Sequence, residues 1–201
     1  MYIAHPNYIR ESSLTSFISY KDFNLADMYK AMLGLPPETN LQLPRLPKKM
    51  AESHFRKMGL IKHKSIILFP EANSVDLVRK ELWEDLAKFY IKLGYSVFSS
   101  VAKPTNQVAG TLPVTIPLAQ IREAAAYARY VISLRSGICE VMSTSKARMM
   151  VIYPDFTWYG GPFISGSSLV KMKLSTNITE VIVDNATKIS NLQLKRFVNE
   201  Q

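Results

Sequence analysis

From residue 65 onward, short apolar runs alternate with longer amphipathic stretches. The apolar runs have the length and the β-branched content of strands that are buried on both faces of a sheet. The expected strands span residues 65–69, 95–100, 112–116, 130–134, 149–154 and 180–184. Since helix-length segments separate them, the pattern predicts βαβ crossovers and an α/β fold: a Rossmann-like parallel sheet with helices on both faces.

The amphipathic stretches predict the helices between those strands. Their apolar residues recur at three- and four-residue steps. The expected helices lie at 80–93, within 117–130, at 137–146 and at about 188–198. In the first of them, Leu82, Leu86, Phe89, Tyr90 and Leu93 form the stripe expected to face the sheet.

Residues 1–62 have a different character, because they hold no strand-like run and carry four prolines between positions 36 and 47. Asn24 is expected to cap a helix that extends to Leu33, and Gly34 to end it. A second helix is expected at 48–58. The sequence therefore predicts a short helical N-terminal segment, 1–62, and one Rossmann-like domain, 63–201.

The net charge of +9 favours an anionic partner: nucleic acid, an acidic membrane face or a phosphorylated small molecule. The basic residues are dispersed, with the densest group at 56–64, so a solvated basic face is an equally simple interpretation. Nucleic-acid binding is not expected, because no stripe pairs basic residues with exposed aromatic ones.

Several classes of protein are disfavoured by what the sequence lacks. No apolar run approaches the roughly 20 residues that cross a bilayer, and no signal pattern opens the chain. The sequence has one cysteine, Cys139, so no internal disulfide can form. We interpret Cys139 as a thiol of the hydrophobic core. We therefore expect a cytoplasmic protein, with at most peripheral contact at the inner face of the membrane.

Neither a metal site nor a bound cofactor is expected. The three histidines do not stand at ligand spacings with cysteine or carboxylates. The glycine patterns of dinucleotide-binding, P-loop and serine-hydrolase proteins are all missing.

In a parallel sheet, ligands bind beyond the carboxyl ends of the strands. After the strand at 130–134 stand Arg135, Ser136 and Gly137, followed by Ile138 at the start of a helix. Free first-turn amides, a capping hydroxyl, a glycine that lets a ligand approach and a bidentate guanidinium together suit a diphosphate. The alternative is that Ser136 is only an N-cap and Arg135 an exposed loop cation.

The loop after the first strand offers Asn73 and Ser74 to an anion or to a sugar hydroxyl. The alternative is that both satisfy their own backbone, as such residues do in turns. Glu71 in the same loop either orients a hydroxyl or is solvated. A further loop, 153–163, gathers aromatic residues that either stack on a ligand, cover an edge of the core or face a partner domain.

The next two loops complete the set of candidates. Ser100 and Lys103 follow the second strand. Ile116, Pro117 and Leu118 follow the third, where an apolar edge suits a nucleobase. The alternative for Pro117 is that it only starts the next helix.

Several of these segments, taken in order, resemble those of a known protein family. The order ILFPEANS, GYSVFSS, TIPLAQIREAAAYARYVISLRSGICEVMS and MMVIYP resembles the C-terminal, donor-binding domain of GT-B glycosyltransferases, of the heptosyltransferase-like or fucosyltransferase-like kind. It covers about residues 60–155. Ser136-Gly137 matches the Ser-Gly pair that meets the diphosphate in that family, and Arg135 stands where the family usually has Asp.

The resemblance implies glycosyl transfer from a nucleotide-diphosphate sugar to a glycan or a lipid-linked acceptor, in polysaccharide or lipopolysaccharide biosynthesis. Arg135 and the amides at 136–137 would stabilise the diphosphate, and 116–118 would border the base. GT-B enzymes close two such domains around their substrates, and 1–62 is too short to be the second, so a partner domain or a homo-oligomer is implied. No catalytic base is nominated. The alternative is a non-catalytic nucleotide-binding module or partner subunit.

Overall fold

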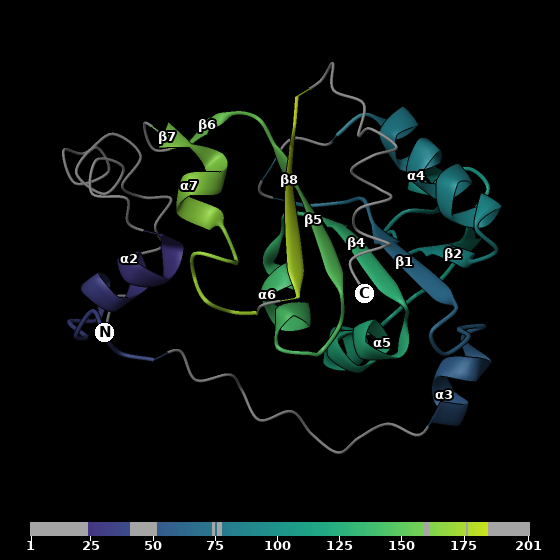
Figure 1. Cartoon of the computed structure of the whole chain (residues 1–201), viewed down its shortest axis with the longest axis horizontal. Helices are drawn as coiled ribbons and strands as arrows, with labels where there is room; N and C mark the ends of the chain where they lie inside the picture. The colour runs from purple at the N-terminus through teal and green to yellow at the C-terminus, as the bar shows by residue number, and fades with distance from the viewer. Residues whose placement is uncertain are drawn as a thin grey trace.

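The computed structural model describes residues 24–40, 52–73, 75, 78–158, 161–175 and 177–184. At its centre lies a six-stranded sheet in the order β3-β2-β1-β4-β5-β8, with every neighbouring pair parallel (Figure 1). The strands are β1 (Ser65–Phe69), β2 (Ser96–Ser99), β3 (Leu112–Pro113), β4 (Tyr130–Leu134), β5 (Met149–Pro154) and β8 (Ile178–Val183). The predicted α/β class and parallel sheet are confirmed.

Helices cover both faces of this sheet, as the sequence predicted. Ile66 and Leu68 of β1 face α4 (Lys80–Lys92), and Ile67 faces the layer that holds α5 (Ile121–Tyr127) and α6 (Gly137–Ser143). The remaining elements are α2 (Leu25–Met32), α3 (Glu52–Lys57), α7 (Phe163–Ser167), the 3-10 turns η2 (Pro104–Asn106) and η3 (Leu118–Gln120), and a hairpin of β6 (Thr157–Trp158) and β7 (Gly161–Pro162).

The central strands form because their residues are apolar on both faces. All five residues of β1 and all five of β4 are buried, and their registers pair Ile67 with Val131 and Leu68 with Ile132. Burial of each such side chain stabilises the fold by about 1.5–3 kcal/mol. A sheet with this pattern excludes water from both faces and leaves the strand ends as the places where polar loops meet solvent.

Helix α4 corrects one detail of the predicted stripe. Leu82, Leu86 and Tyr90 are buried as expected, but Leu93 is 49% exposed. Leu93 is the C-cap, where the chain leaves the helix through Gly94 at φ 84°. Trp83, which the stripe omitted, is 2% exposed instead, because the face covering the sheet is wider than one row of side chains.

Several predicted boundaries also shift. The third strand comprises only Leu112–Pro113 rather than 112–116, since it pairs at the sheet edge with β2 alone and Pro113 has no amide to donate. The following helix opens as the turn η3 before α5 begins at Ile121. The last strand begins at Ile178, two residues before its predicted start at 180. The helix predicted at 188–198 lies outside the described residues.

The helices of the N-terminal segment that are described lie against the sheet domain. Asn24 caps α2 as predicted, through a reciprocal capping box with Asp27, and the chain turns away at Gly34 with φ 64°. Phe55 of α3 is buried and lies 5.0 Å from the Tyr127 ring.

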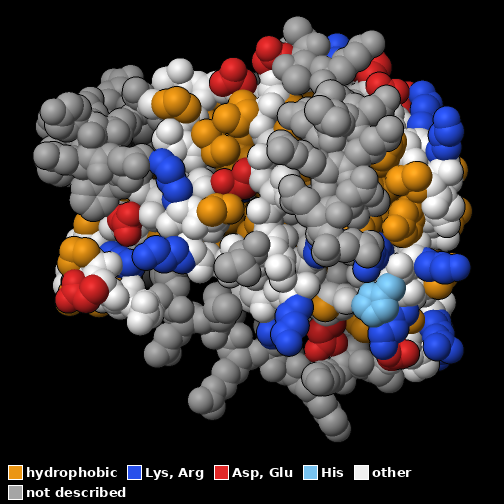
Figure 2. Space-filling view, in the orientation of Figure 1, with side chains coloured by type: hydrophobic (Ala, Val, Ile, Leu, Met, Phe, Trp, Pro, Cys, Tyr) orange, Lys and Arg blue, Asp and Glu red, His pale blue; other side chains and the backbone are white. Residues whose placement is uncertain are grey.

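The surface carries mixed charge. Figure 2 shows Lys and Arg side chains scattered over the visible face, with Asp and Glu between them. In the part of the chain that the structure describes, no helix has both the length and the apolar character needed to cross a bilayer.

Candidate functional site

A cleft of about 520 Å³ opens at the carboxyl ends of β1, β2 and β4, the edge of the sheet where a ligand was expected. Its walls come from the loops after those strands and from the start of α5. Six of the candidate residues line it: Asn73, Ser100, Ile116, Ser136, Gly137 and Ile138. Parallel strands bring their loops together at one edge, so segments far apart in sequence share one cavity.

Three other candidates that the structure describes lie outside the cleft. Lys103, Pro117 and Leu118 follow lining residues in the sequence, but they are exposed and are not among the residues around the cleft. Pro117 precedes η3, and Leu118 at the start of that turn is 63% exposed. Ser74 lies outside the described residues.

The loop from β4 into α6 forms one wall of the cleft. Ser136 occupies the predicted N-cap position, with φ −153° and ψ 171°, but its hydroxyl makes no capping hydrogen bond. The Cys139 amide donates to the Ser136 carbonyl at 3.0 Å. The amides of Gly137 and Ile138 lie in the first turn, where a helix provides no acceptor of its own, so they are suited to an oxygen in the cleft.

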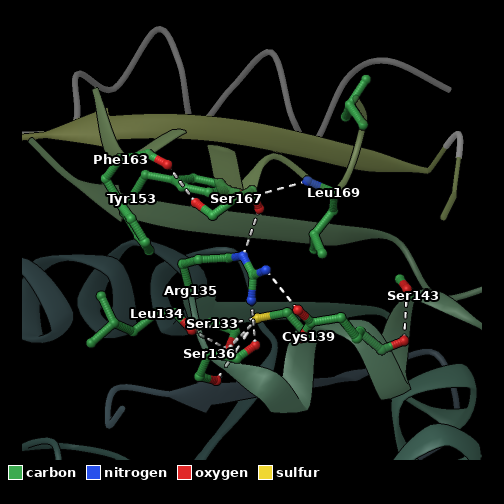
Figure 3. A network of polar contacts seen from close by, with 12 residues as sticks. Ser133, Leu134, Arg135, Ser136, Cys139, Ser143, Tyr153, Phe163, Ser167 and Leu169 are labelled. Carbon is green, nitrogen blue, oxygen red and sulfur yellow. Dashed lines mark hydrogen bonds and ion pairs between the residues drawn. The ribbon is translucent and has the colours of Figure 1, made fainter. Parts of the chain in front are cut away.

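Arg135 differs from its prediction. Its side chain is only 5% exposed and lies between α6 and α7, as Figure 3 shows, rather than in the cleft. Nε donates to the Ser167 carbonyl at 2.8 Å, Nη1 to the Ser136 carbonyl at 2.8 Å and Nη2 to Glu140 Oε1 at 2.6 Å. Because these three partners engage the guanidinium inside the fold, the predicted grip on a phosphate is replaced by a structural role.

The electrostatics of Arg135 agree with that role. Burial alone lowers its pKa, but the charge and hydrogen bond of Glu140 outweigh burial and raise the pKa above its usual value. The guanidinium is therefore positive in the folded protein and held by a partner one turn into α6. No pattern in the sequence indicated that Glu140 and Ser167 would be its partners.

A second set of contacts extends this network to the far strand of the sheet. The Tyr153 hydroxyl lies 2.6 Å from Glu180 Oε1 and 3.3 Å from the Ser167 carbonyl. Glu180 also accepts from Ser168 Oγ at 2.7 Å and from the Leu169 amide at 2.8 Å. Burial first, and then the hydrogen bond to Glu180, raise the pKa of Tyr153 above its usual range. These contacts fix the turn that supports Arg135.

Glu71 bridges two loops at the cleft. Its Oε2 accepts from the Ala102 amide at 2.6 Å, and its Oε1 accepts from the side-chain amide of Asn106. The sequence offered either a solvated carboxylate or one that orients a hydroxyl. The structure shows a third role, because these hydrogen bonds connect the loop after β1 to the loop after β2.

Two further expectations concern Cys139 and the aromatic stretch. The Cys139 thiol is buried, as predicted, and contacts Ser133 Oγ at 3.3 Å and the Leu134 carbonyl at 3.4 Å. In the aromatic stretch, Phe163 is buried and stacks on Phe156 at 4.7 Å, so this pair covers an edge of the core. No cluster of three metal-binding side chains occurs among the residues that the structure describes.

Comparison with solved structures places this fold. It is similar to E. coli ADP-heptose LPS heptosyltransferase II, with a TM-score of 0.58 and 16% identity over 84% of this chain and 55% of that one. The fold of this chain is therefore similar to that of part of a heptosyltransferase. A glycosyl transferase family 9 structure from Veillonella parvula DSM 2008 gives a TM-score of 0.56 at 15% identity, over 81% of this chain and 49% of that one.

The E. coli heptosyltransferase WaaC with ADP is also similar, with a TM-score of 0.51 and 14% identity over 86% of this chain and 53% of that one. This chain therefore spans about half the length of these solved structures. No family model and no curated protein matches the sequence. The resemblance expected from the sequence is confirmed for the fold.

Proposed function

We propose that this chain is the donor-binding half of a glycosyltransferase that takes a nucleotide-diphosphate sugar in polysaccharide or lipopolysaccharide biosynthesis, in the cytoplasm. One observation carries the proposal. A cleft large enough for a nucleotide lies at the carboxyl edge of a parallel sheet whose fold is similar to that of heptosyltransferases.

The lining suggests how such a donor would lie. Ile116 and Ile121 offer apolar surface to a base, and Asn73 and Ser100 offer polar atoms to a sugar or a phosphate. The hydroxyl of Ser136 and the first-turn amides would donate to the departing diphosphate. Catalysis would then consist of positioning together with stabilisation of the leaving group.

The solved structures support the class of ligand. One of the similar E. coli structures holds ADP, and another of the same enzyme holds ADP-2-deoxy-2-fluoro heptose. The acceptor would be a glycan or a lipid-linked acceptor. A partner domain, or another copy of the chain, would supply the remaining half of the site.

A thermal-shift screen against UDP-, GDP-, ADP- and CMP-sugars tests the proposal. A ligand that binds only the folded state raises the melting temperature, by the equivalent of about 2.7 kcal/mol at one hundred times its Kd. We expect one nucleotide series to do so. Absence of a shift with every series would refute the proposal.

Calorimetry on Ser136→Ala then locates the binding. Loss of one hydrogen bond from the Ser136 hydroxyl to the ligand should weaken the affinity about threefold. Ser145→Ala is the matched control, because Ser145 lies just beyond the other end of α6 and its hydroxyl donates to the Met142 carbonyl. Equal affinities for both variants would place the ligand elsewhere.

A second candidate is a non-catalytic binding module or a subunit of a larger enzyme. Among the described residues that line the cleft, no Lys, Arg or His is present to stabilise a departing diphosphate, which favours this candidate. An assay for release of the nucleotide diphosphate separates the two candidates. Binding without turnover by the chain alone supports the subunit, and turnover by the chain alone excludes it.

A further inference from the structure

The charge of the cleft differs from that of an anion-binding site. Among the described residues that line it, Glu71 is the only ionisable side chain, and no Lys, Arg or His lines it. The guanidinium of Arg135 is engaged by Ser167, Ser136 and Glu140. A phosphate in this cleft would therefore meet a like charge without an opposing cation from these residues.

The Glu71 carboxylate is held in place by its neighbours. The Ala102 amide and the Asn106 side chain each donate to a different carboxylate oxygen. An ionised carboxylate only accepts, at about four lone-pair positions, so about two remain for a ligand. Among the described residues, no ion pair involves Glu71.

An oriented, acceptor-only anion favours hydrogen-bond donors that carry no negative charge. Sugar and ribose hydroxyls are such donors, and they form charge-assisted hydrogen bonds with a carboxylate. Phosphate oxygens at neutral pH are acceptors of like charge and gain nothing from it. The two parts of a nucleotide sugar should therefore interact with this cleft very differently.

On the basis of the proposed function, we propose that the cleft selects the uncharged, hydroxyl-bearing part of its ligand through Glu71, and that phosphate groups add little affinity in this chain alone. Glu71 is then a specificity-determining residue. The positive charge that neutralises a diphosphate comes from outside the described cleft, from a partner domain or another chain. This assigns to the partner a chemical role in donor binding.

The test measures affinity along a series of increasing phosphate number. Calorimetry compares each ribonucleoside with its mono- and diphosphate, on the wild type and on Glu71→Gln. In the wild type, the diphosphate should bind less than about fivefold tighter than the nucleoside. In Glu71→Gln, that ratio should rise by about threefold or more, because the repulsion is removed. Glu81→Gln, which makes the same charge change at an exposed position of α4, should keep the wild-type ratio.

Asn106→Ala distinguishes the effect of the Glu71 charge from the effect of loop order, since it removes one hydrogen-bond donor to Glu71 and keeps the carboxylate. It should keep the wild-type ratio. A diphosphate-to-nucleoside affinity ratio of about fivefold or more in the wild type overturns the inference, and so does an unchanged ratio in Glu71→Gln. A changed ratio in Glu81→Gln, or a change in Asn106→Ala that matches that of Glu71→Gln, also overturns it. Those results leave the proposed function standing. Failure of every nucleoside, nucleotide and nucleotide sugar to bind refutes both proposals.

Discussion

Arg135 and Glu140 form a largely buried ion pair, with 2.6 Å between Nη2 and Oε1. The pair joins the residue after β4 to the first turns of α6, and Nε of the same guanidinium reaches the Ser167 carbonyl at the end of α7. Since Ser136 to Ile138 lie between the two charged residues and line the cleft, the ion pair fixes the wall against which a ligand would bind.

Removing one partner of this pair should destabilise the fold. Arg135→Met leaves Glu140 and two carbonyls without their donor, and should lower the free energy of unfolding by about 3 kcal/mol. Glu140 is 33% exposed, so Glu140→Gln should cost less. Urea denaturation measures both.

Lys88→Met is the control for that comparison, because the Lys88–Asp85 pair on α4 is exposed and should contribute less than about 1 kcal/mol. If Arg135→Met proves no more costly than Lys88→Met and yet abolishes ligand binding, the guanidinium acts on the ligand and its structural assignment is wrong.

Gly137 and Gly94 should respond in opposite ways to a methyl group. At Gly137 an added Cβ meets no described atom within 4 Å, so Gly137→Ala should change stability by less than about 0.5 kcal/mol. The same methyl group points into open space beside the cleft and should weaken nucleotide-sugar binding about tenfold. Calorimetry and urea denaturation on one protein preparation give both numbers.

Gly94→Ala is the counterpart, because Gly94 has φ 84° and is not among the residues that line the cleft. It should cost about 1 kcal/mol or more in stability and leave affinity unchanged. A Gly137→Ala variant that binds normally would show that no ligand approaches this backbone.

Tyr153 should make stability depend on alkaline pH. Burial and then the Glu180 hydrogen bond raise its pKa, so the hydroxyl ionises in the unfolded chain first, near pH 10. Its contribution is therefore complete below about pH 10 and is lost as pH rises, at up to about 1.4 kcal/mol per pH unit. Urea denaturation from pH 9 to pH 11 should show a shallower decline for Tyr153→Phe.

Tyr90 provides the comparison at neutral pH. Burial raises its pKa too, but its hydroxyl has no hydrogen-bond partner in the described structure. Tyr153→Phe should cost about 1–2 kcal/mol and Tyr90→Phe should be neutral or stabilising. Equal costs would show that the Tyr153–Glu180 contact contributes nothing.

Cys139 should be inert in the folded protein. It has no exposed surface, and burial raises the pKa of its thiol, which lowers the fraction of reactive thiolate. A chromogenic disulfide reagent should react promptly in concentrated urea and at the rate of unfolding in buffer. Prompt reaction in buffer would contradict the buried position.

The sequence by itself determined the sheet. Strands such as Ser65–Phe69 and Tyr130–Leu134 are apolar on both faces, a local property that needs no knowledge of neighbours. The periodicity of the apolar residues also predicted helix α4, and Asn24 and Gly34 predicted the two ends of α2. The hairpin of β6 and β7, with two residues in each strand, carries too few positions to show a period and was not predicted.

The tertiary structure alone decided what the polar residues of the site do. The Arg135 side chain could have turned toward the cleft or away from it. It turns away because its Nε donates to the carbonyl of Ser167, thirty-two residues later in the chain. Glu71 likewise meets Ala102 and Asn106, at separations of 31 and 35 residues. The tendency of a residue to be buried depends on its own side chain and on its near neighbours in sequence. Its hydrogen-bond partner depends on which distant loops lie beside it in the folded chain.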